Sequence, residues 1–186
     1  MTSIYGVNLL WNQPTVTYRL EFSERDKSIL AVEKSLIEQH IAWAVDSWTS
    51  FSCFPYDIKK AEQDLKADVS IRFEHDEWHH NKTMVAYTHV NSEGKAAIEG
   101  LIQSVQMEFN GAQMFSFTEE TTDTAVDFQT ILLHELGHAL GLAHVVDKTQ
   151  VMDLGVKLGL KKRELTEADK TALCDAYRQR LKNSTE

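Results

Sequence analysis

Residues 134–144 read HELGHALGLAH, and this segment restricts what the chain can fold into more than any other part of the sequence. His134 and His138 are four residues apart, so on a helix their imidazole rings lie on one face and can reach the same ion. Glu135 points about a quarter turn away, which keeps it off the metal but beside the open coordination position. The segment therefore predicts a helix that carries two metal ligands and a general base.

The end of the same segment predicts a third ligand. Gly141 can take the left-handed conformation that ends a helix, and the chain then turns back so that His144 faces the same ion. Three neutral nitrogen ligands, with a fourth position left for water, are typical of a catalytic zinc site and not of a structural one.

The rest of the predicted helix supports this interpretation. HExxH alone also occurs by chance on helices that bind no metal, whereas the five-position pattern HExxHxxGxxH is much harder to meet by accident. The face opposite the histidines is apolar and would anchor the helix in a core; it is formed by Leu132, Leu136, Ala139 and Leu140.

Together with Met152, eight residues after His144, this motif resembles that of the metzincin metallopeptidases. The short link HVVDKTQVMD is most similar to the matrixin (matrix-metalloprotease-like) branch. The resemblance implies an α/β (α+β) fold: a mixed, mostly parallel twisted sheet with an N-terminal, an active-site and a C-terminal helix. We expect residues 1–186 to form one catalytic domain, with an N-terminal subdomain at about 8–141 and a C-terminal one at about 142–182.

The pattern along the chain agrees with that fold and shows no internal repeat. Alternating residues predict strands at 15–22, 69–73, 85–90 and 101–109, and SEG at 92–94 is expected to separate the last two. One amphipathic helix is predicted from Ser23, as the N-cap, to Trp48. Thr166 and Asp169 cap the last helix, whose predicted inner face includes Leu173, Ala176 and Tyr177.

The resemblance also implies a mechanism. Zinc lowers the pKa of its bound water toward about 7, and Glu135 acts as the general base that passes the proton to the leaving amine. Met152 forms an apolar floor beneath the ligands. An extended peptide or protein substrate pairs with an edge strand, for which the substrate-binding residues are Met84, Val85, Ala86 and Tyr87. We therefore predict a zinc-dependent endopeptidase.

The chain departs from the matrixin pattern at a second metal site. Matrixins hold a structural zinc through histidines and an aspartate before the active-site helix, but here Tyr87 stands near where one such histidine would fall, and Glu108 near another. We expect one catalytic zinc ion, and nothing in the sequence indicates calcium. The region is interpreted as a solvated histidine-rich segment; its histidines are His75, His79, His80 and His89.

The segment after Met152 departs as well, because Asp153 and Leu154 replace the tyrosine and proline of the family. The basic residues that follow could favour acidic substrate residues, but a solvated basic loop is the interpretation we adopt; they are Lys157, Lys161, Lys162 and Arg163.

Charge and composition exclude some partners. A net charge of −9 argues against nucleic acid or an anionic membrane as the main partner, and no apolar run is as long as a membrane span. We expect a monomer.

Residues 1–20 lack the features of a signal peptide, although the family is usually secreted, so the sequence leaves the location open. Cys53 and Cys174 could pair, but two buried thiols are the expectation we adopt.

Two other functions remain open. The chain could be a zinc-binding module that recognises a protein without cutting it, although the intact Glu135 argues against this. It could also be a metallopeptidase of another metzincin branch, but the short spacing from His144 to Met152 weighs against the serralysin type.

Overall fold

The computed structural model describes residues 8–62, 65–76, 78–96, 99–155 and 157–183. These residues form eight strands and four helices. The strands are β1 (Asn8–Leu10), β2 (Thr15–Glu21), β3 (Asp57–Lys60), β4 (Val69–Glu74), β5 (Ala86–Ala96), β6 (Glu99–Asn110), β7 (Phe115–Ser116) and β8 (Val126–Asp127). The helices are α1 (Glu24–Leu30), α2 (Lys34–Thr49), α3 (Phe128–Ala139) and α4 (Glu167–Asn183).

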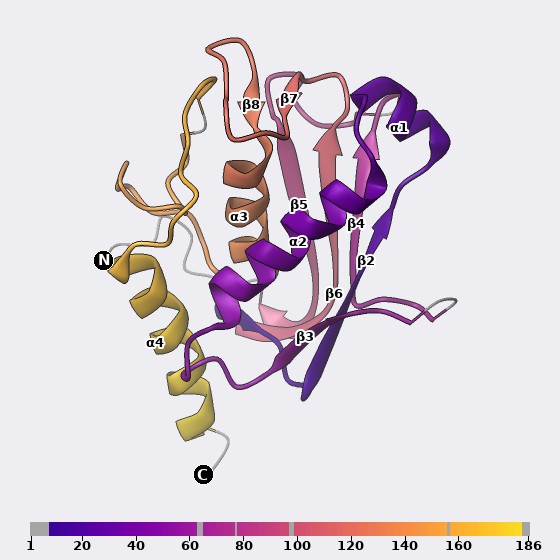
Figure 1. Cartoon of the computed structure of the whole chain (residues 1–186). Helices are drawn as coiled ribbons and strands as arrows, with labels where there is room; N and C mark the ends of the chain where they lie inside the picture. The colour runs from indigo at the N-terminus through magenta and orange to yellow at the C-terminus, as the bar shows by residue number, and fades with distance from the viewer. Residues whose placement is uncertain (1–7, 63–64, 77, 97–98, 156, 184–186) are drawn as a thin grey trace.

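A mixed, mostly parallel sheet forms the centre of the molecule (Figure 1). Its strand order is β1-β6-β4-β2-β3, with every neighbouring pair parallel. β5 is the exception, because it runs antiparallel to β6 and pairs with no other described strand. The predicted fold class is thus confirmed, and β5 leaves one edge of the sheet open.

The helices cover the sheet and bring α3 beside β5. α2 and α3 contact each other in front of the sheet, and α3 also contacts β5 and β6 (Figure 1). The side chain of Trp48 in α2 is fully buried, and its indole N–H donates a hydrogen bond to the carbonyl oxygen of Leu133 in α3 at 2.8 Å. The predicted apolar face of α3 is buried as well. None of the described helices is long and apolar enough to cross a membrane.

The prediction of one helix from Ser23 to Trp48 is wrong in one respect: two helices occupy the segment. Ser23 does cap α1, through a reciprocal capping box with Asp26. Ala31 then takes a left-handed conformation, with φ at 51°, and ends α1 before α2 starts at Lys34. No glycine or proline marks this break, so local propensity does not reveal it.

The strands predicted at 85–90 and 101–109 were too short, because β5 continues to Ala96 and β6 runs from Glu99 to Asn110. SEG at 92–94 lies inside β5, and β5 and β6 form a long antiparallel hairpin with register shifts between Asn91 and Ser92 and between Glu93 and Ala96. At these shifts the strand accommodates extra residues as bulges, so the polar residues interrupt the pairing locally without ending β5. The short strands β1 and β3 at the sides of the sheet were not predicted.

The expectation of two buried thiols is also wrong. Cys53, which follows α2, forms a disulfide with Cys174 of α4, 121 residues later in the sequence. The bond ties the closing helix to the loop after α2. In the chain-entropy model a loop of this length stabilises the folded state by about 4–5 kcal/mol.

Candidate metal centre and substrate cavity

The three histidines of the motif come together at the C-terminal end of α3. His134 and His138 lie on one face of the helix, and His144 returns from the following turn. The three Nε2 atoms are 3.0–3.1 Å from one another. This is the one cluster of potential metal ligands found among the described residues.

Hydrogen bonds determine which nitrogen of two of these rings carries the proton. Nδ1 of His134 lies 2.8 Å from the carbonyl oxygen of Val151, and Nδ1 of His138 lies 2.8 Å from that of Leu142. Because a carbonyl oxygen only accepts, both Nδ1 atoms must donate, and both Nε2 atoms carry a lone pair. Two lone pairs 3.1 Å apart repel each other, and a cation between them removes the repulsion. The donor set therefore fits a metal ion.

Burial keeps these rings neutral. Desolvation lowers the pKa of His134 and of His138 to about 4, and it lowers the pKa of His144 as well. At neutral pH the lone pairs are thus available for a metal ion and are not occupied by protons.

The spacing of the three nitrogens is compatible with zinc. Imidazole nitrogens bind zinc at about 2.0–2.1 Å, and tetrahedral geometry separates them by about 3.3 Å. The observed separations of 3.0–3.1 Å come close to that value. With three nitrogen donors from the chain, a fourth position stays open to a water molecule or a substrate.

Glu135 lies beside the triad in an almost closed environment, with 7% of its surface exposed. Desolvation raises the pKa of its carboxyl group above the ordinary value, while the hydroxyl of Thr88 counteracts this shift. Thr88 Oγ1 donates to Oε2 of Glu135 at 2.6 Å. The carboxylate is thus next to the metal ligands and linked to the edge strand β5.

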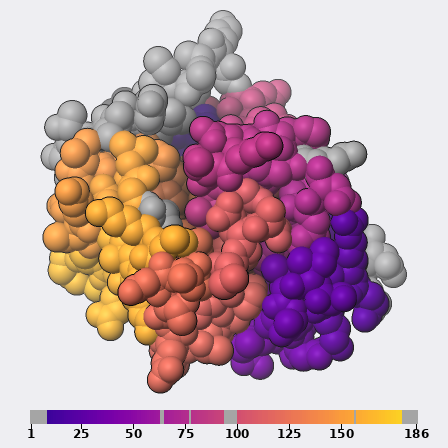
Figure 2. Space-filling model, turned by 90° about the horizontal axis from the view of Figure 1, so that it is seen from above, coloured from indigo at the N-terminus to yellow at the C-terminus, as the bar shows by residue number. Residues whose placement is uncertain are grey.

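A cavity of about 750 Å³ opens in front of the histidines and Glu135. Its lining includes all four predicted substrate-binding residues, Met84 to Tyr87, together with residues 141–144 and Leu154. In the space-filling view, the orange surface of the segments after α3 lies beside the magenta surface of the segments leading to β5 (Figure 2). The cavity thus joins the edge strand to the metal ligands.

The four predicted substrate-binding residues are not equivalent. Met84 and Val85 precede β5, and their carbonyl groups accept hydrogen bonds from Asn110, at 3.0 and 2.9 Å. Ala86 and Tyr87 lie in β5 itself, whose outer edge has no strand partner among the described residues. The open main-chain edge therefore begins at Ala86.

Gly141 and Met152 both lie in close contact with other parts of the chain. Gly141 has a φ of +91°, and a Cβ there would lie 1.8 Å from the carbonyl oxygen of Leu9. The Sδ atom of Met152 lies beneath α3, 2.3 Å from where a Cβ on Gly137 would be. Gly137 was not singled out from the sequence, although a glycine inside a helix, where it costs stability, was a signal for such a close contact.

Asp169 holds the chain that carries Met152. Its carboxylate accepts hydrogen bonds from the amides of Val151 and Met152, at 3.2 and 3.4 Å, and also from Thr166. It is 1% exposed. The predicted cap of the last helix therefore has a second role, because it fixes the methionine segment beneath α3.

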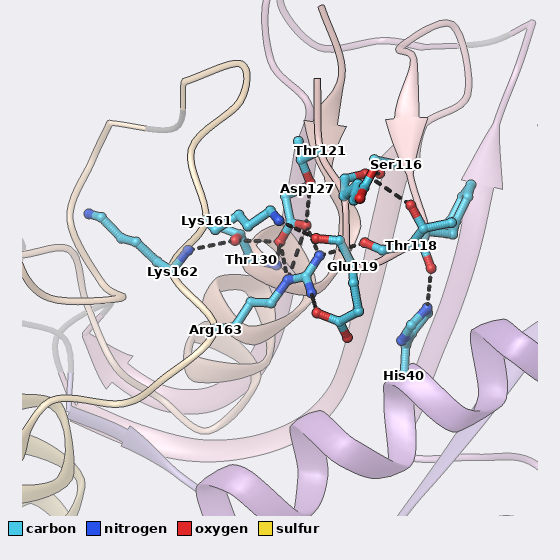
Figure 3. A network of polar contacts seen from close by, with 12 residues as sticks. His40, Ser116, Thr118, Glu119, Thr121, Asp127, Thr130, Lys161, Lys162 and Arg163 are labelled. Atoms are coloured by element: carbon cyan, nitrogen blue, oxygen red, sulfur yellow. Dashed lines mark hydrogen bonds and ion pairs between the residues drawn. The ribbon is translucent and has the colours of Figure 1, made fainter. Parts of the chain in front are cut away.

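Two of the four basic residues after Met152, Lys162 and Arg163, belong to a partly buried network, so the interpretation of a solvated basic loop is wrong for these two. Arg163 donates to Asp127, the N-cap of α3, and to Glu119, as Figure 3 shows. The amide of Lys162 donates to Thr130 Oγ1 at 2.8 Å. Burial opposes ionisation of Asp127, but hydrogen bonds from Arg163 and Thr130 hold its pKa below the ordinary value. Lys157 and Lys161 are exposed, as expected.

The interpretation of a solvated histidine segment is wrong for two of its four histidines. The His75 side chain is 9% exposed and its Nε2 lies 2.8 Å from Oδ1 of Asp26. His80 Nε2 lies 3.1 Å from Oε2 of Glu108, and its ring stacks on Tyr87 at 4.1 Å between centroids. His79 and His89 are exposed.

Comparison with known families agrees with this geometry. The family model described as Matrixin, for M10 peptidases, matches residues 10–178. The chain therefore belongs to the matrixin family, and its histidine triad fits the zinc site HExxHxxGxxH of that family. The search of curated proteins gives no significant match. Family and triad together support a function of the zinc-metallopeptidase type.

Proposed function

We propose that this protein is a zinc-dependent endopeptidase that hydrolyses peptide bonds in proteins. The observation that carries the proposal is the position of Glu135, buried beside three converging imidazoles and open to a cavity with a free strand edge. His134, His138 and His144 would hold one zinc ion. When bound, zinc supplies Lewis-acid chemistry, which activates water and polarises the scissile carbonyl.

The chain's own residues prepare and perform the proton transfer. The carbonyl groups of Val151 and Leu142 orient His134 and His138 and fix their tautomers. Glu135 accepts the proton of the attacking water and passes it to the leaving amine, which cannot depart as an anion. Its burial raises the pKa of its carboxyl group, so the carboxylate is a stronger base than an exposed glutamate.

The edge of β5 binds the substrate. An extended peptide can pair with the main chain from Ala86 onward while its side chains enter the cavity.

Residues 142–182 would form a C-terminal subdomain, and residues 8–141 an N-terminal one, with the cavity between them. Because strand pairing reads the backbone, we propose peptides or proteins as the substrate class and a monomer as the working form. The Cys53–Cys174 disulfide is typical of proteins that fold in an oxidising compartment.

The two alternatives are less well supported. A module that only binds proteins has no need of a buried carboxylate beside the metal ligands. Another metzincin branch is disfavoured because the matrixin model matches residues 10–178.

Digestion of casein or gelatin tests the proposal. The purified protein should cleave them, a zinc chelator should stop the cleavage, and added zinc should restore it. A protein that binds one zinc ion per chain yet cleaves neither substrate would support the non-cleaving alternative.

A further inference from the structure

Among the residues that the structure describes, Thr88 is the one outside the zinc-binding motif whose side chain is found to hydrogen-bond to the carboxylate of the proposed base, Glu135. It lies in β5, where successive side chains alternate between the two faces, so it shares its face with Ala86 and Val90. Ala86 is 8% exposed, and this face of β5 lies against α3. A hydroxyl therefore occupies an inward position between two apolar side chains, where valine would fill the same volume without a polar group.

The hydroxyl is directed at one oxygen of Glu135. Thr88 Oγ1 lies 2.6 Å from Oε2 and 3.4 Å from the carbonyl oxygen of the same residue. A hydroxyl has one proton, so the shorter contact receives it. Among the described residues, no other hydrogen bond to the Glu135 carboxylate is found. The second oxygen, Oε1, is thus left to interact with a water molecule or a substrate.

We infer that Thr88 is a positioning residue, which orients the Glu135 carboxylate for proton transfer and couples it to the strand that binds substrate. The inference rests on the proposed function and adds a residue to its machinery. A glutamate side chain rotates about three bonds, and a charge-assisted hydrogen bond to one oxygen selects one of its orientations. Because Thr88 belongs to β5, the base keeps its place relative to a peptide paired with that strand.

A purely structural role makes a different prediction. If Thr88 only fills space against α3, Thr88→Val should behave like the wild type, because valine replaces the hydroxyl by a methyl group of similar size. Thr88→Ser keeps the hydroxyl but loses the methyl group, so it should be the more damaging change under that role. The positioning role predicts the reverse order.

The experiment compares steady-state kinetics of the zinc-loaded wild type, Thr88→Val and Thr88→Ser on an internally quenched peptide. Thr88→Val should lower kcat roughly 10- to 100-fold, the range for a lost hydrogen bond to a charged group, with KM and zinc content unchanged. Thr88→Ser should keep most of kcat. Thr171→Val, at an exposed position of α4, is the matched control and should equal the wild type.

The inference is overturned if Thr88→Val keeps or exceeds the wild-type kcat, or if Thr88→Ser loses as much as Thr88→Val. Should Thr88→Val not fold, Thr88→Ala takes its place in the comparison with Thr88→Ser.

A second readout separates this inference from the proposed function. In protein labelled with ¹³C at the glutamate side-chain carboxyl, the Glu135 resonance is identified by its absence in Glu135→Gln. Its chemical shift should change in Thr88→Val and stay at the wild-type value in Thr88→Ser. A wild type that cleaves no peptide contradicts the proposed function, whereas a shift that is identical in Thr88→Val and the wild type contradicts the hydrogen bond.

Discussion

The chain has two histidine-rich regions, and the structure uses them in opposite ways. In residues 134–144, three rings turn their Nε2 atoms toward one point, 3.0–3.1 Å apart. In residues 75–89, by contrast, two of the rings point to different carboxylates: His75 lies against Asp26 and His80 against Glu108. A metal site therefore depends on the convergence of lone pairs and not on the number of histidines.

The partners of the rings explain the difference. His134 and His138 donate to neutral carbonyl groups, which leaves each Nε2 lone pair free and unprotonated. In the second region the imidazoles supply hydrogen bonds to carboxylates. Burial opposes ionisation of Asp26 and Glu108, but hydrogen bonds from Ser23 and His75, and from His80 and Arg72, hold the two pKa values below the ordinary range. The second region is thus a set of histidine–carboxylate hydrogen bonds whose rings do not converge on one point.

The largest expected effect is on metal content. His138→Ala removes one nitrogen of the triad, so zinc should fall from one ion per chain to near zero and peptidase activity should disappear. His80→Ala should keep one zinc ion and most of the activity. Elemental analysis of the purified variants measures both. Two zinc ions in the wild type, with one lost in His80→Ala, would show that the second region also holds metal.

The next effect separates the base from the ligands. Glu135→Ala should lower kcat at least about 100-fold, the usual scale for general acid–base catalysis, and keep zinc bound. Glu108→Ala removes a carboxylate of the second region and should lower stability while zinc stays bound. The measurements are peptide hydrolysis and zinc content. Zinc loss in Glu135→Ala would mean that Glu135 is a ligand, and retained activity would contradict the mechanism.

The core of the candidate site could be predicted from the sequence because its geometry is local. The helix period places His134 and His138 on one face, and a glycine turn returns His144 within a few residues. Strand alternation likewise located the start of β5, although the predicted strand ended at Val90. The match to the matrixin family and the clustering of the three rings agree with those predictions.

The features that sequence reasoning missed depend on distant parts of the chain. The Cys53–Cys174 bond spans 121 residues, and the contact of Arg163 with Asp127 spans 36. Thr88 hydrogen-bonds to Glu135, which is 47 residues later in the sequence. A threonine is common within a strand, so its presence there gives no signal of this contact. No periodicity or spacing in a single sequence reports such pairings, since they follow from how the elements pack.

Acid should affect the two regions in different pH ranges. The unfolded chain takes up protons at histidines with a pKa near 6.5, whereas His134 and His138 in the folded, metal-free site resist protonation down to about 4. The free energy of unfolding should therefore fall as the pH drops from about 6.5 to about 4, and zinc should dissociate over the same range. The pKa of Asp26 is lowered by folding, so its carboxylate stabilises the folded state fully above pH 3.8, the ordinary pKa of the group. This stabilisation is lost as the pH falls further.

Urea unfolding of the metal-free protein at a series of pH values measures this difference. His134→Gln should flatten the curve between pH 6.5 and 4, and Asp26→Asn should flatten it only at lower pH. If both variants altered the same pH range, the two regions would not differ electrostatically in the way described.

The smallest expected effect concerns the stability of the second region alone. His80→Ala loses the bond to Glu108 and the stacking on Tyr87, and it should lower the melting temperature by about 2–4 °C, which corresponds to about 1 kcal/mol in a chain of this size. His89→Ala, at an exposed position of β5, is the control and should change stability by less than about 0.5 kcal/mol.

Chelation should lower the melting temperature of every variant that binds zinc, because zinc binds the folded state. The difference between His80→Ala and the wild type should nevertheless be the same with and without chelator, since the contacts of His80 with Glu108 and Tyr87 involve no metal. A difference that vanishes on chelation would assign an ion to His80 and remove the contrast between the two regions.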